Sequence, residues 1–208
     1  PGTHCVRIEN IMMVFGSSDG TVAQVSLPGF FESYNPFHLL YFPEPVTAVL
    51  HRQVDDFAVV ACRNSIHAVQ YVGYRGGELP PATVTTITPD IGIAYQSNWA
   101  LGGGQICAYI EGTGLVMMTS GGEIDFEFGR EVERFTSQWT ASGTVVGFDP
   151  STRSFVASCG NETVSFCLQT GVWSTPIYIS DASVSGIAKS AINSNGSLYI
   201  SLESGGVV

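Results

Sequence analysis

The chain of 208 residues carries 8 Lys and Arg against 18 Asp and Glu, a formal net charge of −10 at pH 7. Because Lys189 is the only lysine, no basic face can neutralise phosphates, which excludes tight nucleic-acid binding by counterion release but not the passage of DNA past the surface. Hydrophobic residues reach 44%, yet no apolar run approaches the roughly 18 residues that a membrane span requires, so we expect one ordered domain over residues 1–208 and no membrane span.

A strand, turn and strand pattern recurs along the whole chain. The turn centres lie about 43 to 49 residues apart, which is the length of four strands and their connections in a β-propeller blade. The first hairpin turns at Ser17 to Gly20 and the second at Arg63-Asn64. The predicted hairpins cover residues 11–26, 57–71, 105–120, 154–168 and 197 onward.

A second feature repeats in phase, ahead of each hairpin. Small and β-branched residues recur at 46–49, 91–94, 144–147 and 184–187. Such residues suit strands crowded round a central axis, so we interpret these segments as the innermost strands of the blades. Segments that follow the hairpins are aromatic and contain proline, as in 31–37 and 173–178, which favours outer strands because edges tolerate proline.

The fold prediction is therefore an all-β propeller of four-stranded antiparallel blades, with four to five blades visible and little helix. The predicted units are 1–44, 45–89, 90–142 and 143–180, followed by an incomplete unit at 181–208. A propeller closes on itself to hide its strand edges. We expect closure from strands elsewhere in a longer chain or from a blade shared by the two ends of this sequence.

An acidic pattern occupies Gly121 to Gly129, where Glu123, Asp125 and Glu127 alternate with apolar residues. On one strand this period of two places the three carboxylates on one face. Such an acidic strand face could collect a cation or face a lumen. The alternative is a solvated outer strand, because neighbouring carboxylates on a strand are roughly 7 Å apart, too far to hold one ion without help.

Three further acids, Glu44, Asp90 and Asp181, each precede an innermost strand in their own repeat. In a closed propeller they would gather near one mouth of the central channel. There they would be structural turn residues, make the channel electronegative, or act as paired acid and base on a substrate.

No catalytic residue, metal site or cofactor is predicted. The four histidines lack the spacing of metal ligands. The five cysteines form an odd set without CxxC spacing and are expected to be mostly buried free thiols, with a disulfide between Cys159 and Cys167 as the alternative.

The order of features from Val14 to Thr119 resembles the propellers of phage tail and head-completion proteins, namely the tail nozzle of short-tailed phages and the packaged-DNA-stabilising protein of the neck. A hairpin leads to the aromatic stretch 31–37, which contains Asn35-Pro36-Phe37. The chain continues through a proline pair into 42–49, then through a hairpin strand over 57–69 to the glycine turn before 114–120. The later segment 173–177 is similar to such blades as well.

The resemblance implies a virion structural protein and no enzyme. Its partners would be other tail, neck or portal proteins, in a homo-oligomeric ring that DNA passes without tight binding. Its location would be the virion, after assembly in the host cytoplasm. Two alternatives remain open: a propeller that binds or processes carbohydrate, suggested by the three acids and by Tyr34, Trp99 and Trp139, and a cellular protein-interaction propeller.

Overall fold

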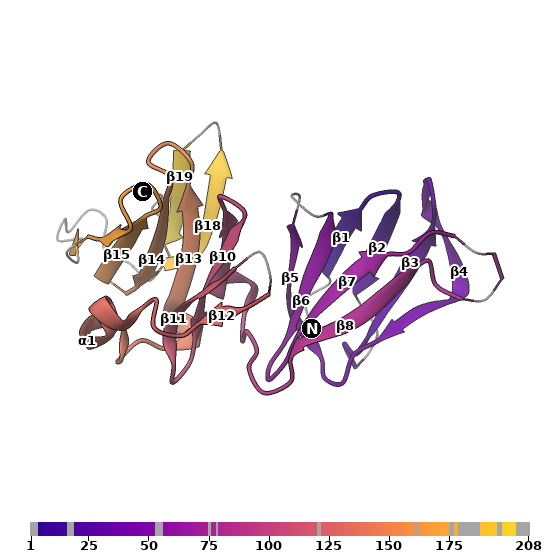
Figure 1. The fold of residues 1–208 in the computed structure, drawn as a ribbon, viewed down its shortest axis with the longest axis horizontal. Coiled ribbons are helices and arrows are strands. Elements are labelled where there is room, and N and C mark those ends of the chain that lie inside the picture. The colour runs from indigo at the N-terminus through magenta and orange to yellow at the C-terminus, as the bar shows by residue number, and fades with distance from the viewer. Residues whose placement is uncertain are drawn as a thin grey trace. The chain divides into compact units, whose positions relative to one another are not determined.

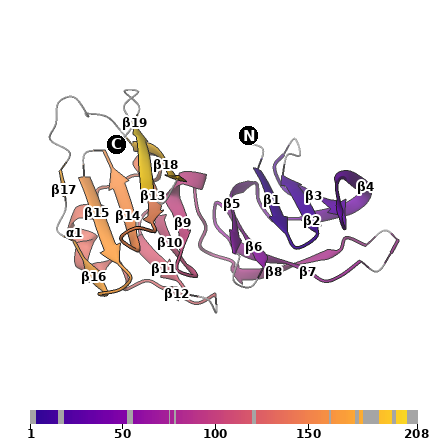
Figure 2. The same cartoon turned by 90° about the horizontal axis from the view of Figure 1, so that it is seen from above.

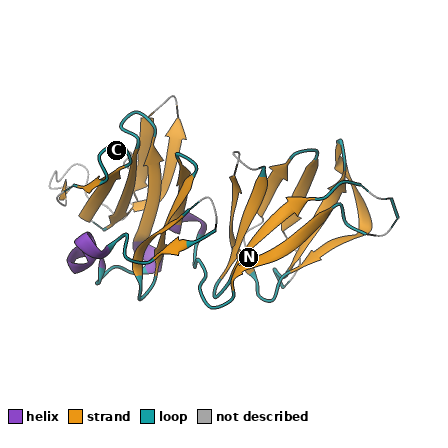
Figure 3. Cartoon of the chain, viewed as in Figure 1, coloured by secondary structure: helices purple, strands orange, loops and turns teal. Residues whose placement is uncertain are grey.

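A computed structural model describes residues 4–15, 19–52, 56–74, 76–77, 79–119, 122–160, 162–174, 177–178, 188–194 and 197–202. The chain divides into two compact units, residues 1–96 and 97–208. Strands dominate both units, as the orange ribbons of Figure 3 show. No helix in the described part of the chain is long and apolar enough to cross a membrane.

Unit 1 (residues 1–96) consists of two four-stranded antiparallel sheets in which sequential strands are neighbours. Figure 1 labels the strands of both sheets. The first sheet contains β1 (His4–Ile8), β2 (Ile11–Phe15), β3 (Val22–Leu27) and β4 (Phe30–Tyr41). The second contains β5 (Val46–Arg52), β6 (Phe57–Cys62), β7 (Ile66–Tyr71) and β8 (Ala82–Thr88).

One apolar core joins the two sheets of unit 1. Strand β2 buries alternate residues Ile11, Met13 and Phe15, as its period of two requires for a sheet with one packed face. The ring of Phe42 then bridges the sheets, since it lies 5.8 Å from the Phe15 ring and 5.6 Å from the His67 ring.

Unit 2 (residues 97–208) repeats the same sheet order, which Figure 2 shows from a second direction. Its first sheet contains β9 (Trp99–Gly102), β10 (Gln105–Ile110), β11 (Gly114–Met118) and β12 (Ile124–Asp125). Its second contains β13 (Thr144–Asp149), β14 (Ser154–Cys159), β15 (Glu162–Cys167), β16 (Val172–Trp173) and β17 (Ile177–Tyr178), and a further pair is β18 (Ala188–Ser194) with β19 (Ser197–Leu202).

Helix is minor, as predicted. The helical segments described are α1 (Glu133–Thr136) and single 3₁₀ turns at Gln96–Asn98, Arg130–Val132 and Ala141–Gly143. The mostly β structure with repeated four-stranded antiparallel sheets confirms the predicted propeller of four-stranded blades. The central strand pairs β2–β3, β6–β7, β10–β11 and β14–β15 are the predicted hairpins.

One predicted inner strand is wrong. Residues 91–94 form no strand, and the third sheet begins instead with β9. Gly92 allows this segment to approach the backbone of the second sheet closely, because a Cβ atom at residue 92 would lie 2.1 Å from the Cys62 carbonyl oxygen. Ile93 is fully buried and its N–H donates to the same oxygen at 3.0 Å. The segment is thus a connection packed against the second sheet.

The other inner-strand predictions have different outcomes. The segments at 46–49 and 144–147 lie in β5 and β13, the first strands of their sheets. The segment at 184–187 lies outside the described residues, although β18 begins directly after it. The outer-strand prediction for 31–37 is confirmed by β4, the fourth strand of the first sheet.

Candidate functional site

Most of the exposed large hydrophobic side chains among the described residues belong to two segments of unit 1. Of the nine described side chains of this kind, six belong to β4 or to the connection between β7 and β8. We call these two segments, β4 and the described residues of 72–81, the outer edge. Its exposed side chains are Phe30, Phe37, Tyr41, Val72, Tyr74 and Leu79.

Strand β4 is interrupted by a large bulge. Leu39 pairs with Gln24 and Tyr34 pairs with Ser26, so the four residues 35–38 oppose a single residue of β3. Pro36 explains the interruption, because proline has no N–H to donate to a ladder. The Asn35 side chain closes the bulge by accepting a hydrogen bond from the Phe37 N–H at 3.0 Å. The sequence Asn35-Pro36-Phe37 therefore builds a turn that projects Phe37, whose exposed fraction is 59%.

Polar contacts fasten the bulge to the second segment of the outer edge. The Asn35 amide donates to the Gly77 carbonyl at 3.3 Å, and His38 Nε2 lies 3.2 Å from the same oxygen. The buried His38 ring also meets the Tyr74 ring edge-on at 6.0 Å. Because these contacts hold the two segments together, Phe37 and Tyr74 are presented from a fixed support.

Of the predicted channel-mouth acids, Glu44 and Asp90 lie within the described residues. Both carboxylate oxygens of Glu44 are within hydrogen-bonding distance of the Asn64 side-chain amide, and one accepts from the Asn64 N–H at 3.1 Å. Glu44 thus caps the β6–β7 turn, which is the structural role among the alternatives. Asp90 is exposed in the connection after β8, and Asp181 lies outside the described residues.

The predicted acidic strand face is wrong, since β12 covers only Ile124 and Asp125 and Glu127 lies beyond its end. The Asp125 carboxylate accepts from the Glu127 N–H at 2.9 Å and turns the backbone. Glu127 then pairs with Arg130 at 2.6 Å. Glu123 is exposed before the strand. Within the described ranges no cluster of three His, Cys, Asp or Glu side chains is arranged to hold a metal ion.

Two of the three aromatic residues that suggested a carbohydrate site are buried and cannot contact a sugar at the surface. Trp99 and Trp139 are buried, and the Trp139 backbone oxygen accepts a hydrogen bond from the Tyr109 hydroxyl at 2.6 Å. They belong to the core of unit 2, because large aromatic rings gain most by burial. Tyr34 is half-buried in β4.

The cysteines are free thiols, and Cys62 and Cys107 are buried while Cys159 and Cys167 are partly so. The register of β14 and β15 excludes the alternative disulfide between Cys159 and Cys167. Cys159 pairs with Glu162, whereas Cys167 pairs with Ser154 at the other end of the β14–β15 ladder. Five residues of strand separate the two positions by roughly 17 Å, beyond the Cα separation of less than about 7 Å that a disulfide allows. Cys5 is exposed.

Comparison with known proteins supports the fold alone. No family model and no curated protein matches the sequence. A catalytically inactive variant of virginiamycin B lyase from Staphylococcus aureus, solved with quinupristin, matches with a TM-score of 0.61 at 10% identity over 98% of this chain and 67% of the other. A luciferin-regenerating enzyme matches with a TM-score of 0.58 at 10% identity over 98% of this chain and 69% of the other.

Proposed function

We propose that this chain is a structural, non-enzymatic propeller module of a bacteriophage tail or neck, where it forms or decorates a ring-shaped conduit for DNA. The resemblance of residues 14–119 to tail and head-completion propellers supports this choice. The other support is the outer edge of unit 1, with its supported and solvent-exposed aromatic side chains. The proposal requires no cofactor.

The outer edge is the observation on which the proposal chiefly rests. Phe37, Tyr74 and Leu79 have exposed fractions of 59%, 50% and 71%. Aromatic and large apolar side chains are enriched in the centres of protein interfaces, and their exposure in groups is costly unless a partner covers them. We assign the edge to contacts with a second copy of this chain. A head-to-tail contact between two different surfaces, repeated with rotation, closes into a ring.

The charge of the chain suits a DNA passage. With 18 acids against 8 basic residues the surface repels phosphates. A wall that bound the backbone tightly would slow sliding, because each neutralised phosphate adds affinity through counterion release. Other tail, neck or portal proteins would be the further partners, in a virion assembled in the host cytoplasm.

Light scattering on the purified chain tests the proposal through its oligomeric state. We expect a discrete oligomer. Phe37→Ala should raise the concentration at which this oligomer dissociates at least tenfold. The matched control is Phe126→Ala, which truncates an exposed phenylalanine of unit 2. A chain that stays monomeric up to its solubility limit, or an oligomer equally weakened by both variants, would overturn the assignment of the outer edge.

A further inference from the structure

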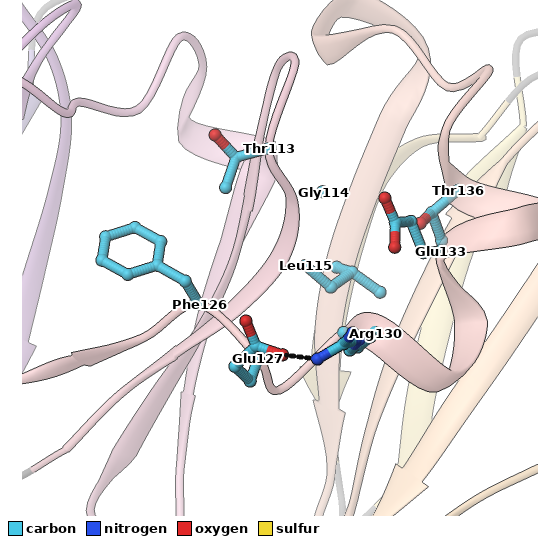
Figure 4. Close-up of a pocket in the computed structure, with 9 residues that line it drawn as sticks. Thr113, Gly114, Leu115, Phe126, Glu127, Arg130, Glu133 and Thr136 are labelled. Atoms are coloured by element: carbon cyan, nitrogen blue, oxygen red, sulfur yellow. Dashed lines mark hydrogen bonds and ion pairs between the residues drawn. The ribbon is translucent and has the colours of Figure 1, made fainter.

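A pocket of about 300 Å³ lies in unit 2 beside α1, outside every site considered above. It is formed by the β10–β11 turn, the residues after β12 and the helix, and Figure 4 draws its side chains. Its size is at the lower end of the range for small-molecule sites. The lining residues that matter are Thr113, Gly114, Phe126, Arg130, Glu133 and Thr136.

One buried hydroxyl in the lining has no hydrogen-bond partner among the described residues. Thr136 is 1% exposed, and its Oγ1 atom makes no hydrogen bond within the part of the chain that the structure describes. It lies 3.7 Å from the position that a Cβ atom on Gly114 would take, and both residues line the pocket. Buried polar groups are nearly always hydrogen-bonded. This hydroxyl therefore indicates a polar group from outside the chain.

The charges of the lining narrow the class of ligand. Glu127 and Glu133 contribute two negative charges and Arg130 one positive charge, a net of −1, and Arg130 is paired with Glu127 at 2.6 Å. This balance disfavours anions, and no three His, Cys, Asp or Glu side chains among the described residues are grouped to hold a metal ion. The polar lining does not suit an apolar ligand, because its groups would lose water without gaining partners. A neutral ligand with many hydrogen-bonding groups remains.

An aromatic ring completes the set. Phe126 lines the pocket and is 46% exposed. Figure 4 shows Phe126 and Thr113 to the left of Gly114 and Leu115, Glu133 and Thr136 to their right, and Arg130 beside Glu127 below them. Arg130 and Glu133 also line a second pocket of about 380 Å³, together with Glu131, Arg134 and Ser137. Polar groups thus continue along α1 beyond the first pocket.

We infer that this pocket binds a neutral sugar. Its hydroxyls donate to the Glu133 carboxylate, accept from the Arg130 guanidinium and bond the Thr136 hydroxyl, and the C–H face of its ring lies against Phe126. Vicinal hydroxyls need donors and acceptors at neighbouring positions, which the alternation of carboxylate, guanidinium and hydroxyl supplies. The inference does not depend on the virion role, because it concerns a different unit and different residues.

NMR titration of the isotopically labelled chain tests the inference. The neutral probes are glucose, galactose, N-acetylglucosamine and the linear trimers of each, and the charged probes are choline and inorganic phosphate. We expect saturable shifts of the Gly114 and Gly129 amide signals with at least one neutral probe. Phe126→Ala and Thr136→Val should each raise the dissociation constant at least fivefold.

Two controls separate binding from folding and from the assembly proposal. Phe37→Ala truncates a similarly exposed phenylalanine of unit 1 and should leave the dissociation constant unchanged. Phe126 is exposed, so its variant folds even where Thr136→Val does not. Absence of shifts with every neutral probe, tighter binding of choline or phosphate, or an unchanged dissociation constant in Phe126→Ala would each overturn the inference. None of these results bears on the oligomeric state.

Discussion

The side-chain amide of Gln96 pairs with both backbone groups of Val49. Its Oε1 atom accepts from the Val49 N–H at 2.7 Å, and its Nε2 atom donates to the Val49 carbonyl at 3.1 Å. The amide thus continues the ladder of β5 as a neighbouring strand would. The chain that leaves the second sheet is held to that sheet's first strand in this way.

Replacing Gln96 by Ala should lower the free energy of unfolding by about 1 to 3 kcal/mol, since two hydrogen bonds are lost. Gln96→Glu should cost a similar amount, because a carboxylate accepts from the N–H but cannot donate to the carbonyl. Denaturant unfolding followed by fluorescence measures both. A full rescue of stability in Gln96→Glu would show that the second bond is unimportant.

Asn98 has a comparable role in unit 2 and is fully buried. Its Nδ2 atom donates to the carbonyls of Ala141 and Thr144 at 2.7 and 2.9 Å. Asn98→Asp should lower the free energy of unfolding by about 2 to 4 kcal/mol, because a carboxyl group of the same shape leaves both carbonyls without these donors. Thermal unfolding monitored by circular dichroism measures the loss. A change of less than about 0.5 kcal/mol, typical of surface substitutions, would contradict the role.

The repeat explains what the sequence could and could not predict. Hairpins such as β6–β7 were predictable because β-branched and apolar residues with a polar turn recur at a fixed spacing. The small residues at 91–94 led to the wrong prediction of an inner strand, because crowding round an axis and the close approach of a connection both select glycine. A pattern of residue types does not distinguish these causes.

Other features had weaker signals. The alternation at 123–127 indicated a strand, but one Asx turn at Asp125 ended it. The amides of Gln96 and Asn98 were missed because single polar residues have no periodicity. Their contacts nevertheless follow the repeat, since Gln96 and Val49 are 47 residues apart and Asn98 and Thr144 are 46 apart. A search for polar residues one repeat from an inner strand would have found them.

Gly92 should not tolerate a side chain. A Cβ atom at this position would lie 2.1 Å from the Cys62 carbonyl oxygen, which is backbone and cannot rotate away. Gly92→Ala should lower the free energy of unfolding by roughly 2 to 3 kcal/mol. The control is Gly143→Ala, whose Cβ would meet only side-chain atoms at 3.2 and 3.3 Å. Equal losses in the two variants would contradict the close approach.

The Asp56 carboxylate should make stability depend on pH. It pairs with His51 at 2.8 Å and accepts from the Glu9 N–H at 3.1 Å. The hydrogen bond from His51, with a smaller contribution from the Glu9 N–H, lowers the pKa of Asp56 below its ordinary value of 3.8. Because the folded pKa is the lower one, the contribution is complete above pH 3.8 and is lost as pH falls from there through the folded pKa.

Denaturant unfolding as a function of pH measures this effect. Asp56→Asn should reduce the loss of unfolding free energy that occurs as the pH falls below 3.8. A second lowered pKa, that of Asp149, arises chiefly from its hydrogen bonds with Ser151 and should leave part of the slope in place. If Asp56→Asn leaves the whole slope unchanged, the pair with His51 does not stabilise the fold.

Cys167 should be the most readily alkylated cysteine. Hydrogen bonds from the Thr170 side chain and backbone lower the pKa of its thiol to about 7, whereas burial raises the pKa of the Cys107 thiol. Thiolates are the reactive form. Mass spectrometry after iodoacetamide treatment of the native chain near pH 7 should find Cys167 modified first and Cys107 protected. Thr170→Val should slow modification of Cys167 near pH 7, and an unchanged rate would contradict the assigned cause.

Electron microscopy of the chain produced together with the products of its neighbouring reading frames tests the proposed structural role most directly. The proposed function predicts closed rings with an open bore, located at the tail or neck of assembled particles and disrupted by Phe37→Ala but not by Phe126→Ala. Single unassociated molecules, absent from particles that are otherwise complete, would contradict it.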